Sequence, residues 1–561
     1  MTRHPLSFRH RVIAGTSALA LGLVSALGAA AAANAVQVPN TGLIDESRTG
    51  TLTIVKRAAG ANTAGSIDGQ DEGTGTPLAG AQFVIHKIDG TDLKTTAGWE
   101  KVDALKRVNL MNACANADAP TLNGYTFSDP KTTSQTAAGT GKTTPVSGLA
   151  LSAYLVCEKV KPAQALKPAA PFIVTVPTPF DNGTTPWLYD ITVYPKNVVT
   201  NAPTKTQTID ANATLGIADH VKFAISAVVP AIDVKEHFSM FTLADPLPGG
   251  FEDIKITGVT LAEAGGGNPV TVTETTHYTK NIVQDKHWAQ IIFTRDGLNL
   301  LKQNAGKTVT MSLAATVKTL PDGVADRGVL KNTGYLMFDT VIPGGDEPPQ
   351  PTTPPMTPPD NPGDAPKVPD TPGTPPLTPT NNDVYSKWGG FQIPKVNQGH
   401  PDQVLPGAEF QVFVAKDQYA AECTSRETTG EALSFKSPTG TTQTLVTDAQ
   451  GLLVVPGVLI DQKSVASGQD AGLQSHRCLV LVETKAPAGY VKPSGENAKT
   501  PIKITGGMST SDTAISNTQQ GVPELPITGA SGQLLLTVGG VALLLFASGG
   551  YLVNRRRSAQ K

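Results

Sequence analysis

The sequence predicts an all-β protein that consists of several sandwich-like domains. Short runs of alternating apolar and polar residues recur along the 561-residue chain, separated by turn residues. Thr, Val, Gly and Pro are frequent, whereas long amphipathic helical patterns are scarce. These features together are typical of β-sandwiches. Without its two ends the chain retains roughly 490 residues, which corresponds to about three domains of ordinary size.

The first 35 residues have the order of a secretory signal peptide. Three arginines within the first eleven residues precede an apolar stretch over 12–33, and Ala33-Asn34-Ala35 supplies the small residues for cleavage after Ala35. A first transmembrane helix is the alternative. Gly, Ser and Ala dilute the apolar stretch, however, and the small-residue site ends it. We therefore expect residues 1–35 to be removed on export.

The C-terminus (524–561) carries three features in a fixed order. They are the pentapeptide Leu525-Pro526-Ile527-Thr528-Gly529, an apolar run over 534–553, and Arg555-Arg556-Arg557. The apolar run is long enough to span a bilayer, and the arginines would hold its end in the cytoplasm. Together the three features resemble the cell-wall sorting signal that sortases read. The resemblance implies cleavage between Thr528 and Gly529 and transfer of the Thr carbonyl to an amine, so that the helix is a temporary tether.

Charge and cysteine content limit the possible partners and ligands. The formal net charge is −2, which gives no indication of nucleic-acid binding or of a polybasic membrane patch. An even number of cysteines in an exported protein indicates disulfides. Three connectivities are possible, but each pair falls inside one expected domain, so we favour Cys114–Cys157 and Cys423–Cys478. Because the sequence has no C-x-x-C motif and no Cys/His cluster, we expect neither a metal site nor a cofactor.

An internal repeat suggests the domain organisation. The pattern at 77–83 recurs at 405–410, each copy preceded by a strand that ends in lysine. About eighty residues after each copy comes a strand that contains glutamate. Residues 36–197 and 382–523 are therefore expected to share one fold, whereas 198–342 is strand-rich without this pattern.

Residues 343–381 differ from the rest of the chain in composition, because they contain about fifteen prolines. Proline removes backbone donors and fixes φ, so we expect neither sheet nor helix but an extended, semi-rigid spacer. A Pro-rich recognition ligand is the alternative.

Strand alternation places several polar residues on apolar faces. Lys56, for example, shares a face with Leu52 and Ile54. A buried lone Lys or Glu is costly, so such a position requires a partner or a reaction. The residues concerned are Lys56, Glu158, Asn332, Lys395, Glu483 and Asn517. Cys157 and Cys478 lie an odd number of residues from the neighbouring glutamate and are expected to face the opposite way.

Residues 483–490, ETKAPAGY, resemble the E-box ETxAPxGY of the Cna-type immunoglobulin-like domains of Gram-positive pilins. The resemblance implies three tandem immunoglobulin-like β-sandwiches, Cna-B-like first and third and Cna-A-like second. Such domains form spontaneous Lys–Asn isopeptide bonds. Burial leaves a neutral amine as nucleophile and keeps a nearby carboxylic acid protonated, so that the acid polarises the Asn carbonyl while ammonia leaves. The first and last strands are thereby joined.

The resemblance implies one such centre in each domain. The expected lysine, asparagine and acid are Lys395, Asn517 and Glu483 in the third domain, Lys205, Asn332 and Asp245 in the second, and Lys56, Asn197 and Glu158 in the first. Lys222 competes with Lys205, and the E-box that begins at Glu158 is degenerate. A surface salt bridge is the alternative at every site.

Residues 187–197, WLYDITVYPKN, resemble the pilin motif WxxxVxVYPKN, with Ile191 at the first Val position. Pro195 places this strand at a sheet edge. If Asn197 points into the core, Lys196 points outward. In the family that lysine accepts the sorting-signal threonine of the next subunit, here Thr528. A solvated strand-end lysine is the alternative.

The resemblance as a whole implies the major subunit of a covalent surface pilus that supports adhesion. Its partners would be a pilin-specific sortase, a housekeeping sortase, identical subunits, accessory pilins and peptidoglycan. Each isopeptide would be a single-turnover self-modification, so we expect no enzyme activity. A monomeric wall-anchored adhesin, or a tip or base pilin, remains the alternative. A surface enzyme is disfavoured because the sequence has no nucleophile elbow or zinc motif.

Overall fold

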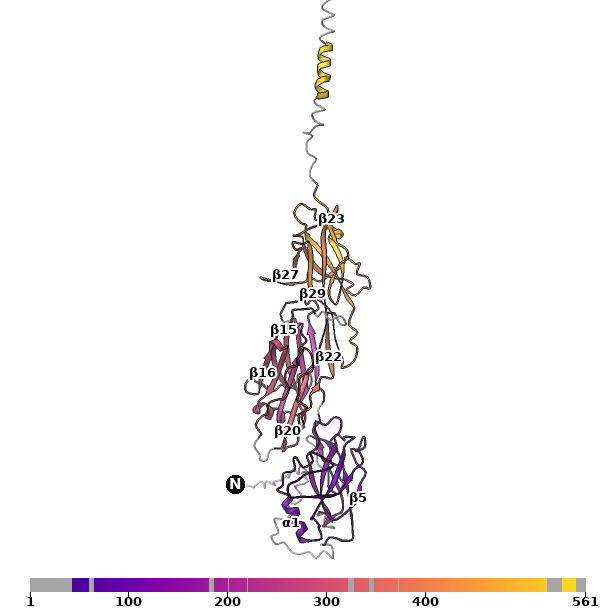
Figure 1. Ribbon diagram of the computed structural model, residues 1–561, viewed down its shortest axis with the longest axis vertical. Helices are drawn as coiled ribbons and strands as arrows, with labels where there is room; N and C mark the ends of the chain where they lie inside the picture. Colours follow the sequence, from indigo (N-terminus) through magenta and orange to yellow (C-terminus); the bar gives the residue numbers. More distant parts are fainter. Residues whose placement is uncertain are drawn as a thin grey trace, which may run out of the picture. The chain divides into compact units, whose positions relative to one another are not determined.

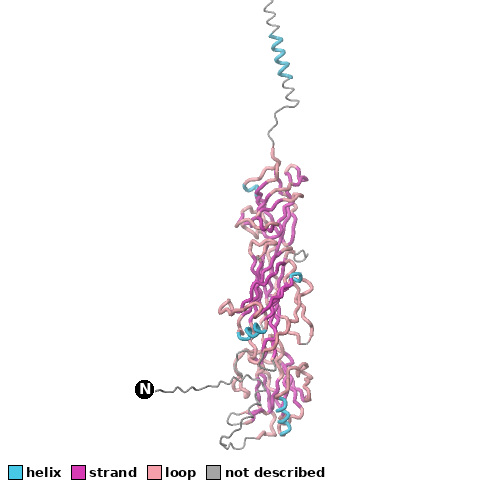
Figure 2. The backbone as a smooth tube through the Cα atoms, turned by 90° about the vertical axis from the view of Figure 1, so that its left-hand side faces the viewer, coloured by secondary structure: helices cyan, strands magenta, loops and turns pink. Residues whose placement is uncertain are grey.

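The computed structural model describes residues 43–59, 65–180, 186–199, 201–218, 220–320, 327–342, 348–371, 373–521 and 537–550. Strands form most of the regular structure, as Figures 1 and 2 show, so the all-β prediction is confirmed. The chain divides into two compact units. The first comprises residues up to Trp388 together with Val458–Ser475, and the second comprises Gly389–Gly457 and the residues from His476 onward.

The N-terminal part of the first unit is a sandwich that contains a short helix. Its elements are β1 (Gly50–Ile54), β2 (Arg57–Ala58), β3 (Gln82–Ile88), α1 (Thr96–Leu105), β4 (Phe127–Thr132), β5 (Val146–Leu149), β6 (Ser152–Val160), β7 (Phe172–Val176), β8 (Thr178–Pro179), β9 (Trp187–Leu188), β10 (Asp190–Val193) and β11 (Lys196–Asn197). Sheet β10-β1-β5 and sheet β4-β3-β6-β7 enclose a core around Ile54, Phe83 and Val156. The other face of β6 packs against α1. A further parallel pair, β11 with β2, brings Asn197 opposite Ala58.

The remainder of the first unit is a larger sandwich. Its elements are β12 (Thr204–Ile209), β13 (Val221–Val228), β14 (His237–Pro246), β15 (Phe251–Ala262), β16 (Tyr278–Val283), η2 (Gln284–Lys286), β17 (Trp288–Phe293), α2 (Arg295–Gln303), β18 (Thr308–Val317), β19 (Val329–Asn332), β20 (Tyr335–Val341) and β21 (Thr378–Pro379). Sheets β12-β13-β18-β15 and β16-β17-β14-β20-β21 face each other across a core rich in phenylalanine. Alternate residues of β13, such as Phe223 and Ile225, point into this core.

The proline-rich segment (348–381) does not form the expected spacer. Thr352 N–H donates to Ser239 C=O at 2.8 Å, and β21 adds to the edge of the β14–β20 sheet. Met356 is buried in an apolar cluster with Trp288 and Met337 of that sheet. The prediction of neither sheet nor helix is therefore wrong for the described part of this segment. Prolines are tolerated at sheet edges, and the apolar residues between them cover the outer face of the sheet.

The second unit is a third sandwich. Its elements are β22 (Asn382–Asn397), β23 (His400–Val404), β24 (Glu409–Ala415), β25 (Thr428–Thr429), β26 (Phe435–Ser437), β27 (Gly440–Thr442), β28 (Thr444–Val446), β29 (Leu452–Ala466), β30 (His476–Lys485), η3 (Gly495–Ala498), β31 (Lys499–Thr505), β32 (Gly507–Thr510) and β33 (Ile515–Asn517). Two of these strands, β22 and β29, also extend into the first unit. Strand β24 pairs with β30, and the C-terminal half of β22 runs parallel to β32 and β33.

The N-terminal half of β22 belongs to the first unit. It pairs with β19, so that Asn332 lies opposite Val384, and it buries Val384 and Trp388 in the core of the second domain. The expected start of the third domain at residue 382 is therefore too early, because apolar residues up to Trp388 complete the preceding core. The insertion 458–475 also belongs to the first unit.

The two ends of the chain are described only in part. A helix covers 537–550, inside the apolar run expected to cross a membrane. Among the described residues, no helix is long and apolar enough for a membrane span. The expected signal peptide and the pentapeptide Leu525-Pro526-Ile527-Thr528-Gly529 lie outside the described residues.

Candidate functional site

The third domain brings Lys395, Glu483 and Asn517 together in its core. They come from β22, β30 and β33, and none is more than 2% exposed. Lys395 Nζ lies 2.8 Å from Glu483 Oε2 and also donates to Asn517 Oδ1. Asn517 Nδ2 donates to Glu483 Oε1 at 2.6 Å. Burial lowers the pKa of Lys395, although the adjacent glutamate opposes the shift.

The second domain brings Lys205, Asp245 and Asn332 together between its two sheets. Lys205 Nζ is 2.5 Å from Asp245 Oδ2, and Asn332 Nδ2 is 3.5 Å from the same oxygen. Burial lowers the pKa of Lys205 and raises that of Asp245, so both groups shift toward their neutral forms. The competing Lys222 is exposed on β13 and does not belong to this centre.

The first domain assembles Lys56, Glu158 and Asn197 in the same way. Lys56 Nζ is 3.2 Å from Glu158 Oε1, and Asn197 Nδ2 donates to Glu158 Oε2 at 3.0 Å. The carbonyl of Lys167 also accepts from Asn197 Nδ2, at 2.7 Å. Burial lowers the pKa of Lys56 to about 8, with Glu158 opposing the shift. All three centres are buried, so a surface salt bridge describes none of them.

This arrangement can form an amide bond without an external catalyst. A neutral lysine Nζ attacks Cγ of the asparagine, and a carboxylic acid beside both groups can donate a proton to the amide and accept one from the amine. The new Nζ–Cγ bond replaces the Cγ–Nδ2 bond, and Nδ2 leaves as ammonia. Such a reaction also converts the ionisable lysine amine into a neutral amide in an apolar core, where an isolated charge is costly.

The strand end at Lys196 has a different environment. Tyr194 and Asn197 are buried, whereas Lys196 is partly exposed and lies opposite Arg57 in the parallel pair of β11 with β2. Within the part of the chain that the structure describes, the Lys196 amine makes no hydrogen bond or ion pair. Adjacent residues thus place one side chain inside the domain and a lysine amine at its surface.

The two predicted disulfides, Cys114–Cys157 and Cys423–Cys478, are confirmed. Cys157 packs on the α1 side of β6, whereas Tyr154 and Val156 face the core on the other side. The disulfide and the Lys56 centre therefore lie on opposite faces of one strand, as its alternation predicts.

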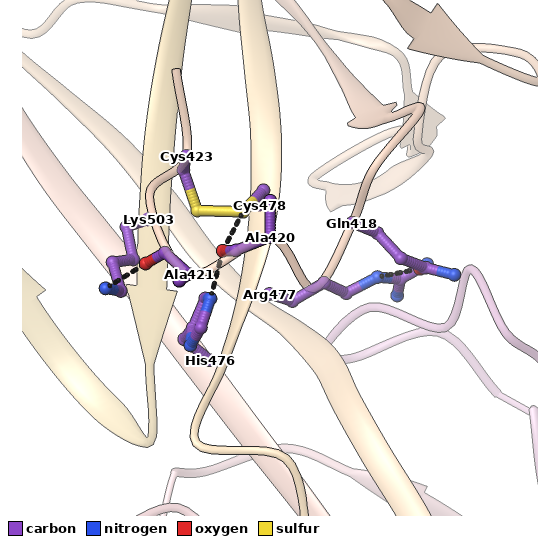
Figure 3. Close-up of a disulfide and its surroundings, with 8 residues drawn as sticks. All are labelled: Gln418, Ala420, Ala421, Cys423, His476, Arg477, Cys478 and Lys503. Carbon is purple, nitrogen blue, oxygen red and sulfur yellow. Dashed lines mark hydrogen bonds between the residues drawn. A yellow bond between two sulfur atoms is a disulfide. The ribbon is translucent and has the colours of Figure 1, made fainter. Parts of the chain in front are cut away.

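One cluster that was not expected from the sequence lies at the second disulfide (Figure 3). The side chains of Cys423, His476 and Cys478 offer three potential ligand atoms within 4.8 Å of one another. Both sulfurs are in the disulfide and His476 Nε2 hydrogen-bonds to Ala420 C=O at 2.7 Å, so the cluster as it stands has no thiolate for a metal. Residues 476 and 478 share a strand face, and this spacing could have indicated the cluster.

These features define the class of protein as an all-β protein in which each of three domains buries a lysine, an asparagine and an acid side by side. Comparisons identify the family. Residues 47–198 match the N-terminal D1 domain of Gram-positive pilin subunits, and residues 517–559 match the LPXTG cell wall anchor motif. The chain is 35% identical over 567 residues to fimbrial subunit type 2 of Actinomyces naeslundii, covering 98% of this chain and 97% of the relative. It is 28% identical over 607 residues to fimbrial subunit type 1 of Actinomyces viscosus, covering 100% of both chains.

Solved structures support the same conclusion for the fold. The full-length major pilin SpaD from Corynebacterium diphtheriae superimposes with a TM-score of 0.59 at 23% identity, over 86% of this chain and 99% of that one. The chain belongs to the family of Gram-positive fimbrial subunits, or pilins. It is a cell-wall-anchored subunit of a surface pilus and, through its LPXTG motif, a sortase substrate that polymerises into fimbriae. The family is structural rather than catalytic.

Proposed function

We propose that this chain is the major, shaft-forming subunit of its pilus and that a pilin-specific sortase joins Thr528 of one subunit to Lys196 of the next. One observation carries the proposal. Lys196 has a partly exposed, unpaired amine in the part of the chain that the structure describes, directly beside the buried Asn197. The side chain of Asn197 anchors the strand end, so the neighbouring amine is held at a defined place on the surface.

The linkage follows from the chemistry of the sorting signal. The sortase cysteine attacks the carbonyl of Thr528 and releases the segment that begins with Gly529, which leaves a thioester. Lys196 Nζ, as a free amine, attacks this thioester; an amide forms and the sortase thiol is regenerated. A housekeeping sortase then transfers the Thr528 carbonyl of the last subunit to an amine of peptidoglycan. Accessory pilins are joined by the same chemistry.

We also propose that all three buried centres become Lys–Asn isopeptide bonds. Their support is the burial of every member and the contact of each acid with both its lysine and its asparagine. The bonds would be Lys56–Asn197, Lys205–Asn332 and Lys395–Asn517. A covalent tie across each sandwich prevents the domain from unravelling when the fibre is pulled.

Co-expression of the full chain with its pilin-specific sortase tests the intersubunit linkage. Boiling in SDS should leave a high-mass ladder that Lys196→Arg abolishes, because the guanidinium keeps the positive charge but is not a nucleophile. Lys94→Ala, at an exposed lysine of the same domain, is the matched control and should keep the ladder. A ladder that persists in Lys196→Arg refutes the assignment of Lys196. No ladder from the unmodified chain favours the monomeric wall-anchored adhesin.

Mass spectrometry tests the internal bonds separately. Each one lowers the intact mass by about 17 Da, because ammonia leaves in the Lys–Asn reaction. Peptide mapping then assigns each loss to a domain, and a domain whose lysine and asparagine peptides remain separate has no bond.

A further inference from the structure

The outer edge of β12 is held by side chains from distant parts of the chain. Among the described strands β12 pairs only with β13. On its other edge, Asn382 Oδ1 accepts from Lys205 N–H at 2.9 Å, and Asn382 Nδ2 donates to Lys205 C=O at 2.6 Å. The Gln462 side chain makes the same pair of bonds with Ile209, at 3.1 and 2.8 Å. A side-chain amide thus takes the place of a neighbouring strand at the reactive lysine.

The next residue, Asp383, holds the other reaction partner. Asp383 is 2% exposed, and the mechanism of the second-domain centre does not use it. Its Oδ1 accepts from the Thr333 hydroxyl at 2.6 Å, and its Oδ2 lies 3.1 Å from Lys331 Nζ. Lys331 and Thr333 are the two neighbours of Asn332, so one buried carboxylate fixes the chain on both sides of the amide. A buried carboxylate is costly unless it is paired, and these contacts offset that cost.

We propose that Asn382 and Asp383 are positioning residues for the Lys205–Asn332 bond. Asn382 hydrogen-bonds to the main chain of the nucleophile, and Asp383 binds the side chains on either side of the electrophile. One dipeptide therefore sets the approach of Nζ to Cγ. The inference rests on the proposed isopeptide in the second domain. Displacing reacting groups by about 1 Å can slow a reaction roughly 100-fold, so contacts made outside the centre can control its rate.

The position of Asn382 and Asp383 in the chain also links bond formation to folding. Asn382 and Asp383 follow the proline-rich segment and begin β22. The positioning contacts at Lys205 and beside Asn332 are therefore complete only when β22 has paired with β19. Amide formation in this domain is then fastest after that pairing, so a partly folded domain is locked in place only slowly.

The experiment follows bond formation in full-length chains. Chains denatured before reaction are refolded, and the Lys205–Asn332 and Lys395–Asn517 peptides are quantified by mass spectrometry over time. Asn382→Ala and Asp383→Ala should slow the second-domain bond about 10- to 100-fold while the third-domain bond forms at the unmodified rate. Asp383→Glu should recover part of the rate. Asp360→Asn, which breaks an exposed pair with Lys367, is the matched control and should change neither rate.

The outcomes are distinguishable. Second-domain bonds that form at the unmodified rate in both alanine variants overturn the positioning role. An unmodified chain that never loses ammonia in this domain refutes the proposed isopeptide itself. Should Asp383→Ala fail to fold, as judged by circular dichroism and proteolysis, the milder Asn382→Gln decides: slowed bonding in a folded domain supports the proposal, and an unchanged rate overturns it.

Discussion

Replacing Asn517 by alanine isolates the contribution of one internal cross-link. The substitution removes the electrophile but leaves Lys395 and Glu483 paired at 2.8 Å. No unpaired buried charge is created, whereas truncating either of those two residues would create one at a cost of several kcal/mol. The change in stability therefore reports mainly the loss of the proposed covalent bond.

The expected magnitude follows from the loop that the bond closes. Lys395 and Asn517 are 122 residues apart, and the Cys423–Cys478 disulfide inside this loop spans 55 residues. The disulfide shortens the effective loop to about 67 residues, for which the chain-entropy model gives roughly 4.4 kcal/mol at 25 °C. A unit of roughly 115 residues has an unfolding entropy near 0.24 kcal/mol/K, so its Tm should fall by about 18 °C.

Calorimetry of the full-length chain measures this shift, and intact mass confirms that the third-domain loss of about 17 Da has disappeared. Asn497→Ala, at an exposed asparagine of the same unit, is the matched control and should leave both the mass loss and the Tm unchanged. A Tm that falls by less than about 3 °C once the bond is absent would refute the cross-link as the main source of stability. Persistence of the mass loss in Asn517→Ala would refute the assignment of the asparagine.

Three further predictions concern the other parts of the chain. Because burial lowers the pKa of Lys56 to about 8, the neutral amine increases as pH rises, and bonding in the first domain should be faster at pH 8 than at pH 6. Refolding at pH 6 to 9 with mass detection checks this, and a rate that does not rise over this range contradicts it. Replacing Cys423 and Cys478 by alanine should lower the free energy of unfolding of the second unit by about 4 kcal/mol. The isopeptide should still form, because the disulfide and the isopeptide lie on opposite faces of β30. Loss of the isopeptide in this variant would show that the disulfide must form first. Met356→Ala should destabilise the second domain by about 2–5 kcal/mol in chemical denaturation. The control Met111→Ala, at a side chain that is 45% exposed, should not. Equal losses of stability in the two variants would contradict the packing of the proline-rich segment.

Strand alternation explains why so much of the candidate site could be predicted. In a two-layer sandwich one face of each strand meets the core, so the parity of Lys56 with Leu52 and Ile54 predicts a buried lysine, and the structure buries it. The same rule separates Cys157 from Glu158, and the structure places the cysteine on the α1 side of β6. These inferences need only local sequence.

The features that could not be predicted depend on contacts between distant residues. The high proline content indicated a spacer, but it gives no information on whether Met356 has a sheet to cover. Similarly, the Asn382 side chain hydrogen-bonds to Lys205, which lies 177 residues earlier in the chain. The alternation of apolar and polar residues in the two strands gives no indication of this contact. The boundary at Trp388 has the same origin, since that residue completes a core formed earlier in the chain.

Load on the fibre connects the proposed bonds with the proline-rich segment. Force would enter a subunit at Lys196 and leave at Thr528. The bond between Lys205 and Asn332 would transmit the force directly, so the residues between them would not be stretched. The bond between Lys395 and Asn517 would protect the residues between those two positions in the same way. Of the loaded chain, residues 333–383 form a loop that is closed by the antiparallel pairing of β19 with β22, where Asn332 lies opposite Val384. Hydrogen bonds rather than a covalent bond close this loop.

The ladder of β19 with β22 should therefore be the element that yields when one subunit is stretched. Strand β20 stays paired with β14, so release of the β19–β22 ladder frees only the roughly 40 residues between β20 and β22. Single-molecule stretching should therefore give one step of at most about 150 Å. The step should be reversible, because the proline-rich segment can pack again on an intact sheet. In Lys205→Ala, which cannot form the second-domain bond, the same pull should also extend the residues between 205 and 332 and lengthen the step more than threefold. Equal steps in the two chains would show that the second-domain bond does not carry the load.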